Sequence, residues 1–174
     1  MEGDVIFEYP LTGDFRYAIA EKGYATDAYK FVYHNGTILE GTTKRGIRDS
    51  TFTYTFKNGS TQEVEFKGGF PADKEGFVKD GFAYFKKFKD GYYSGDWKKN
   101  APHGKGTFSS NDLFYRGDWI DGKKEGEGYI SYPDDDTYRG SFKNDVRHGK
   151  GIHRFQELKS YMEGTFLKIS WKAQ

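Results

Sequence analysis

Three segments near the C-terminal end of the chain share one pattern. YSGDWKKNAPHGKGTF begins at Tyr93, YRGDWIDGKKEGEGYI begins at Tyr115 and YRGSFKNDVRHGKGIH begins at Tyr138. The starts are 22 and 23 residues apart. A period of this length is typical of a protein built from one small structural unit in tandem. Any role for a single residue therefore has to be judged against its equivalents in the other units.

Each unit has the alternation of a β-hairpin. Tyr93, Gly95 and Trp97 fall on one face of a strand, and polar residues fall on the other. After a polar connection at 99–102, residues 104–108 alternate in the same way and predict a second strand. Glycine normally weakens a strand. Repeated in the same register, it is expected to leave room for the Tyr or Trp ring of the neighbouring strand.

Turn signals and isolated anchors extend the repeat beyond these three segments. The connections between units are expected to be type I′ turns at Asn35-Gly36, Asn58-Gly59 and Asp90-Gly91, with Asp135-Asp136 in the equivalent place. Further strand anchors are expected at Gly13, Gly41, Val64 and Gly164. The intervals from Gly13 to Gly41 and from Val64 to Gly95 are longer than the others. They predict insertions near 18–28 and 71–82, each holding a longer connection or a degenerate hairpin.

The predicted fold class is all-β: an elongated, twisted, single-layer antiparallel sheet of about seven tandem β-hairpins. A single array is expected over residues 1–174, with clear repeats at about 84–155 and divergent repeats or caps at 1–83 and 156–174. The composition favours this fold, because 19% of the residues are aromatic and 23 are glycine. An open sheet of this many strands is expected to twist.

The pattern Tyr-x-Gly-x-Trp-x-x-Gly-x-x-x-Gly-x-Gly, nearly complete from Tyr115 to Gly128, resembles the MORN (membrane occupation and recognition nexus) repeat. Asn100 and Asp145 replace one of its glycines in the other two clear units. The resemblance implies an elongated single-layer array that serves as a scaffold for partner proteins, for a second copy of itself or for phosphoinositide headgroups. Val64 and Thr43 depart from the pattern in the N-terminal half.

Composition and motifs exclude several function classes. The chain has no cysteine, which rules out thiolate metal sites. Its sequence pI of about 7.8 lies below the range of a typical nucleic-acid-binding domain, so no nucleic-acid partner is expected. The start lacks the basic and apolar regions of a signal peptide, and we expect a cytoplasmic protein, at the cytoskeleton or at the cytoplasmic face of a membrane.

Neither an active site nor a cofactor site is expected. His103 and His148 occupy equivalent places in their repeats, which would put them about 19 Å apart in a sheet, too far to share a metal. The acidic run at Asp134–Asp136 is read as a turn, because it lacks the spaced oxygen ligands of a calcium loop. The Gly-x-Gly pairs are strand glycines with no following helix to form a phosphate loop. We expect a non-catalytic protein.

The aromatic face is the predicted partner-binding groove. Its residues have two interpretations: rings that pack on one another as a core, or an exposed stripe that holds a partner segment or a second copy of the chain. We favour the second for the face as a whole. The predicted groove consists of Tyr93, Trp97, Phe108, Tyr115, Trp119, Tyr132, Tyr138 and Phe142.

Basic residues near the hairpin ends give the alternative function, an adaptor for phosphoinositides or other anionic membrane lipids. Seven residues carry this hypothesis: Lys98, Lys99, Lys105, Lys123, Lys124, Arg147 and Lys150. Acidic residues are mixed among them, which is typical of a solvated surface.

Overall fold

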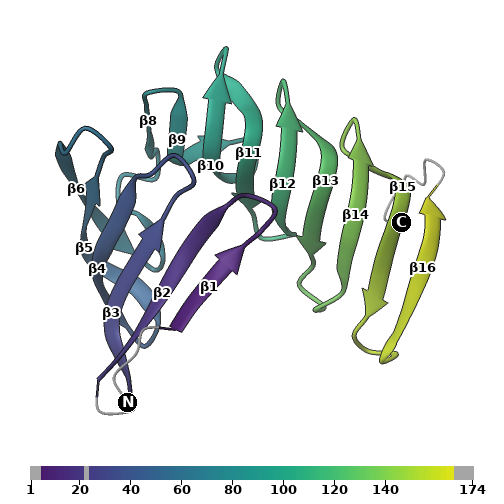
Figure 1. The fold of residues 1–174 in the computed structure, drawn as a ribbon, viewed down its shortest axis with the longest axis horizontal. Coiled ribbons are helices and arrows are strands. Elements are labelled where there is room, and N and C mark those ends of the chain that lie inside the picture. Colours follow the sequence, from purple (N-terminus) through teal and green to yellow (C-terminus); the bar gives the residue numbers. More distant parts are fainter. Residues whose placement is uncertain (1–4, 22–23, 167–174) are drawn as a thin grey trace. The chain divides into compact units, whose positions relative to one another are not determined.

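The computed structural model describes residues 5–21 and 24–166, and these residues form strands and turns with no helix among them. The chain divides into two compact units, Met1–Gly76 and Phe77–Gln174, which we describe separately as the N-terminal and the C-terminal unit. In the described part of each unit, strands that follow one another in sequence pair antiparallel (Figure 1). The all-β prediction is confirmed, whereas a single array over the whole chain stays a prediction.

The described part of the N-terminal unit is a seven-stranded sheet. Its strands are β1 (Val5–Tyr9), β2 (Asp14–Glu21), β3 (Tyr24–Val32), β4 (Ile38–Lys44), β5 (Ile47–Thr55), β6 (Thr61–Lys67) and β7 (Phe70–Pro71). Gly41 in β4 and Val64 in β6 lie opposite Phe52, as strand anchors should. Gly13 does not: it lies in the turn before β2, where its N–H donates to the carbonyl of Tyr9 over 2.8 Å.

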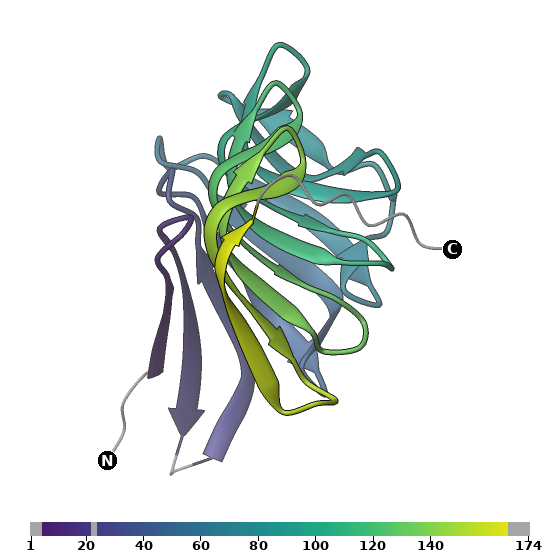
Figure 2. The same cartoon turned by 90° about the vertical axis from the view of Figure 1, so that its right-hand side faces the viewer.

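The described part of the C-terminal unit is a nine-stranded sheet. Its strands are β8 (Phe77–Lys79), β9 (Phe82–Phe88), β10 (Gly91–Lys98), β11 (Ala101–Ser109), β12 (Phe114–Ile120), β13 (Lys123–Ser131), β14 (Thr137–Lys143), β15 (Val146–Phe155) and β16 (Ser160–Phe166). Successive hairpins of this unit follow one another as a twisted ladder (Figure 2). The three clear repeats are the hairpins β10–β11, β12–β13 and β14–β15.

The predicted insertion near 71–82 contains the boundary between the two units. It also holds a short hairpin, β8–β9, in which Lys79 lies opposite Phe82. The other predicted insertion, near 18–28, is the β2–β3 pairing, where Glu21 lies opposite Tyr24. Its residues 22–23 lie outside the described residues. The described residues form sixteen strands, two more than the fourteen strands that seven hairpins would give.

The type I′ turns lie within the repeats and not between them. Positive φ angles at both central residues, which type I′ requires, occur in the two-residue loops Lys99-Asn100, Asp121-Gly122 and Asn144-Asp145. The prediction for the connections was wrong. At Asn35-Gly36 only the glycine has a positive φ, and its N–H donates to the carbonyl of Tyr33, which makes a type I turn followed by a left-handed residue.

The connection at Asn58-Gly59 follows the same rule, with a positive φ at Gly59. In the acidic turn the positive φ is at Asp135, so the equivalent pair is Asp134-Asp135 and not the predicted Asp135-Asp136. At Asp90-Gly91, by contrast, Gly91 already belongs to β10 and lies opposite Phe88. In the acidic run, Asp134 Oδ1 accepts the N–H of Asp136 over 3.1 Å. Its interpretation as a turn is confirmed.

The strand glycines make room for rings, as the alternation predicted. A methyl group on Gly106 would lie within 2.6 Å of three atoms of the Tyr93 side chain, and one on Gly128 within 2.8 Å of Tyr115. Contacts under 3.0 Å are essentially never made by real Cβ atoms. Each ring lies against the glycine, and the Tyr115 hydroxyl donates to the carbonyl of Asp118 over 3.0 Å.

The first glycine of each Gly-x-Gly segment, two residues before Gly106 or Gly128, serves a different purpose. Gly104 and Gly126 have φ angles near +60°, at a bulge that only glycine enters without strain. The carboxylate of the Tyr-x-Gly-Asp segment closes the bulge: Asp96 Oδ2 accepts the N–H of Lys105, and Asp118 accepts the N–H of Glu127. The third repeat has Ser141 at this position.

Candidate functional site

The aromatic residues of the C-terminal unit form one continuous ladder on one face of strands β10–β16, which we call the ring face. Neighbouring rings meet nearly at right angles, with centroid separations of 5.0–5.3 Å along most of the series. Such edge-to-face pairs are favourable because the positive ring edge meets the negative face. The series runs Trp97, Tyr93, Trp119, Tyr115, Phe142, Tyr138 and Phe166.

Most of the predicted groove is core and not exposed surface. Six of its eight residues are at most 5% exposed: Tyr93, Phe108, Tyr115, Trp119, Tyr138 and Phe142. Trp97 and Tyr132 are half-buried and pack against this core. The expected exposure was wrong because the rings cover one another along the sheet. A role for the eight residues in partner binding stays a prediction.

Basic side chains complete the cover over the rings. Lys124 lies opposite Trp119, and its ammonium group is 5.5 Å from the ring centroid of Tyr115 and 5.8 Å from that of Trp119. Arg147 occupies the equivalent place in the next repeat, opposite Phe142. Sequence reasoning missed this role, although the signal exists: both residues follow a type I′ turn by two positions.

The seven basic residues therefore fall into two groups. Lys124 and Arg147 lie on rings, and Lys105 forms an ion pair with Asp118. The remaining four are exposed: Lys98, Lys99, Lys123 and Lys150. A lipid-binding surface made of all seven is not present as one exposed cluster.

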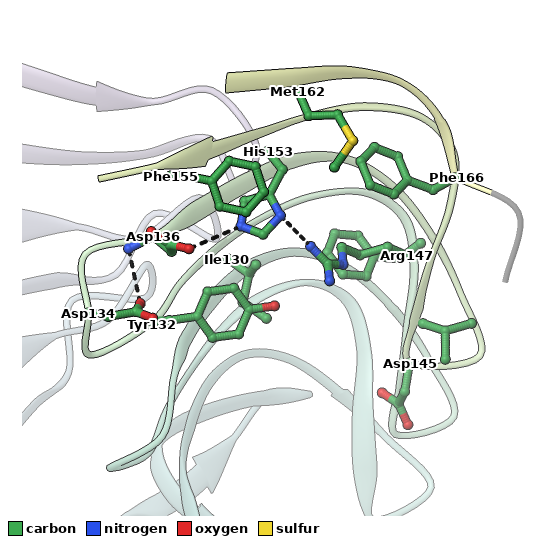
Figure 3. Close-up of a pocket in the computed structure, with 12 residues that line it drawn as sticks. Ile130, Tyr132, Asp134, Asp136, Asp145, Arg147, His153, Phe155, Met162 and Phe166 are labelled. Atoms are coloured by element: carbon green, nitrogen blue, oxygen red, sulfur yellow. Dashed lines mark hydrogen bonds and ion pairs between the residues drawn. The ribbon is translucent and has the colours of Figure 1, made fainter. Parts of the chain in front are cut away.

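A hollow of about 610 Å³ opens at the C-terminal end of the ring face (Figure 3). We call it the terminal hollow. Strands β13–β15 contribute Ile130, Phe142, Val146 and Phe155 to its lining, and Tyr132 comes from the turn after β13. Met162 and Phe166 of β16 form the opposite wall. In the described part of the chain β16 is the edge strand, so this wall has no further strand beside it.

Polar groups converge in the terminal hollow (Figure 3). Arg147 Nη1 lies 2.8 Å from His153 Nδ1. A guanidinium group can only donate, so His153 Nδ1 is the acceptor and the ring proton sits on Nε2, 3.6 Å from Asp136 Oδ2. Burial and the neighbouring Arg147 charge lower the pKa of His153, which keeps this imidazole neutral.

The four histidines have different surroundings. No group of three or more potential ligands occurs among the described residues. His103 Nδ1 lies 3.6 Å from Asp121 Oδ1, His34 pairs with Asp14, and His148 is exposed. Among all the residues that the structure describes, no helix has the length and apolar composition needed to span a membrane.

Comparisons with known proteins agree with this geometry. The family model of the MORN repeat matches residues 93–112, 115–137 and 138–156, which correspond to the three clear hairpins. MORN repeat-containing protein 3 of Xenopus laevis is 36% identical over 77 residues, an alignment that covers 40% of this chain and 32% of that protein. Human alsin is 26% identical over 117 residues, which cover 49% of this chain and 7% of alsin. The chain thus matches about a third of the first relative and a small part of the second.

Proposed function

We propose that this chain is a non-catalytic protein-interaction module and that the terminal hollow holds an extended segment of a partner protein; the match of three hairpins to the family model of the MORN repeat supports the module. MORN repeats commonly mediate interactions with proteins or membranes. The observation that carries the finer proposal is the hollow itself, an apolar space that the described residues leave unfilled.

Two features favour a polypeptide as the occupant. The hollow combines aromatic and aliphatic walls with a few polar groups, the composition typical of binding sites. One wall is an edge strand, β16, whose backbone can pair with an added strand. The Met162 side chain of this strand lines the hollow and is 50% exposed, so its apolar surface is open to a partner.

Adjacent residues of β16 supply a matched pair of variants. Met162 lines the hollow, whereas Tyr161 is not among the lining residues and, one position away on a strand, points to the opposite face. Peptides selected from a displayed library on the unmodified chain should bind the Tyr161→Asp variant as well as the original. The Met162→Asp variant should lose them, because a carboxylate then stands in the apolar hollow. Equal binding by both variants would refute a site at the hollow.

A second copy of the chain is the other protein partner to be tested. Pairing of two copies through the β16 edge would bury the same Met162 wall. Light scattering at increasing concentration distinguishes the cases. Self-association predicts that the measured mass of the unmodified chain doubles, whereas the Met162→Asp variant keeps the mass of a single chain.

The membrane alternative rests on the lysines that remain exposed. Lys98, Lys99 and Lys123 lie at or beside the loops of two neighbouring hairpins. Each basic residue near an anionic leaflet contributes about 1 kcal/mol. Flotation with phosphoinositide-containing liposomes at physiological salt tests this function. The triple Lys→Gln variant should float less than the unmodified chain, and absence of flotation by the unmodified chain would refute the membrane function.

A further inference from the structure

Arg147 lines the terminal hollow, where it contacts two aromatic rings and a histidine. Its guanidinium carbon lies 5.3 Å from the ring centroid of Tyr138 in β14 and 5.7 Å from that of Phe166 in β16. One of its nitrogens donates to His153. These contacts hold the charge at the wall of the hollow.

Among the described residues, Arg147 forms no ion pair with an Asp or Glu side chain. Its hydrogen-bond acceptor is the neutral imidazole of His153. The acidic residues of the hollow have other contacts. Asp134 accepts the N–H of Asp136, and Asp136 accepts the N–H of Gln156 and faces His153. Asp145 pairs with Lys124 and Lys89.

The preceding repeat has the same arrangement with an acid beside the cation. Lys124, the equivalent of Arg147, lies on the rings in the same way, and Asp145 Oδ1 is 3.8 Å from its ammonium group. Asp145 belongs to the loop of the next hairpin, β14–β15, and it also accepts the N–H of Lys124 over 2.9 Å. An aspartate from the adjoining repeat thus balances the positive charge of the lysine on the ring face. In the described part of the chain, Arg147 has no adjoining hairpin beyond β16 to supply that acid.

We propose that Arg147 anchors a carboxylate side chain of the partner, and that the partner is an extended segment with an Asp or Glu beside an apolar residue. The carboxylate takes the place that Asp145 holds beside Lys124. The apolar residue enters the hollow against Met162 and Phe155. This inference rests on the proposed function, because it names the chemistry of the segment that the hollow accepts.

Arginine suits this task better than lysine. The planar guanidinium presents several N–H donors in a fixed fork and binds a carboxylate through two parallel hydrogen bonds. Partial burial among rings weakens the screening by water and salt. A segment that carries lysine or arginine at this place would be repelled by the fixed charge.

The test uses peptides selected from a displayed library on the unmodified chain and measured by fluorescence anisotropy. We expect enrichment of Asp or Glu at one position, and a loss of affinity of about tenfold or more when that Glu is replaced by Gln in the peptide. Changing the peptide leaves the protein fold untouched. On the Arg147→Met variant, which retains an apolar side chain over the rings, the same Glu→Gln change should have no effect.

Lys150→Met is the matched control, since it removes one positive charge from the same strand at an exposed position. It should retain the tenfold discrimination between the Glu and Gln peptides. Arg147→Lys should retain only part of it. Selected peptides without an acidic preference, or with equal discrimination by Arg147→Met, would overturn the carboxylate anchor while leaving the hollow as a peptide site. Selected peptides that bind Met162→Asp unchanged would instead refute the proposed function itself.

Discussion

The close approach of ring and glycine gives the sharpest test of the fold. A methyl group on Gly151 would stand 2.4 Å from the Tyr138 hydroxyl and 2.6 Å from two of its ring carbons. The ring has little freedom to move away. Its hydroxyl donates to the carbonyl of Ser141 over 3.1 Å, and it meets Phe142 and Phe166 edge to face at 5.3 and 5.0 Å.

We expect the Gly151→Ala variant to lose about 2 kcal/mol of unfolding free energy. Keeping the ring in place overpacks the core at a cost of about 1–3 kcal/mol. Displacing it gives up a hydrogen bond of about 1 kcal/mol and two ring pairs of about 0.5–1.5 kcal/mol each. The reduced freedom of the unfolded chain returns about 0.4–1 kcal/mol. Both routes therefore end near the same value.

Urea unfolding followed by the fluorescence of Trp97 and Trp119 measures this loss, because both residues belong to the same unit as Gly151. Gly164→Ala is the control: Gly164 lies opposite Gly151, and a methyl group there would have no atom within 4 Å. It should leave stability unchanged or raise it slightly. In a Tyr138→Leu background, Gly151→Ala should cost less than about 0.5 kcal/mol, since no ring then covers the glycine. An equal cost in both backgrounds would refute the reasoning.

Three further outcomes follow from single contacts. Tyr115→Phe should lower the unfolding free energy by about 1 kcal/mol, because the hydroxyl no longer bonds to Asp118; no change in a urea titration would contradict this. Asp118→Ala should cost about 1 kcal/mol through the lost bulge contact with Glu127, and Asp118→Asn less. The folded state lowers the pKa of His153, so the unfolded chain binds more protons and stability should fall as the pH drops from 7 through 6.5. His153→Gln should remove this part of the pH dependence in thermal melts between pH 7 and 5.5.

The sequence was sufficient for the strands and for the purpose of the glycines. Alternation at Tyr93, Gly95 and Trp97 predicts a β-strand with one aromatic face, and its repetition in the same register strengthens this prediction. Turn types were less accessible. An Asn-Gly pair fits a type I′ turn, but it also fits a type I turn followed by a left-handed glycine, and only the strand register around Gly36 decides.

The burial of the groove could not be read from the pattern alone. Alternation places Tyr115 and Trp119 on one face but does not say that each ring covers the next. The terminal hollow depends on contacts among two successive hairpins and the edge strand β16, in which Arg147 reaches a ring of β16 and a histidine six residues away. The histidines were considered as metal ligands and set aside, so the part of His153 in holding Arg147 appeared only with the geometry.

Methyl NMR of Met162 tests the central claim most directly. The chain has two methionines, so the signal of the Met162 methyl group is assigned from its loss in a Met162→Leu variant. Addition of a selected Glu-containing peptide should shift this signal in saturable fashion, and the same peptide with Gln should require about tenfold more to reach the same shift. A peptide that binds tightly while the Met162 signal stays unchanged would show that the partner segment does not enter the terminal hollow.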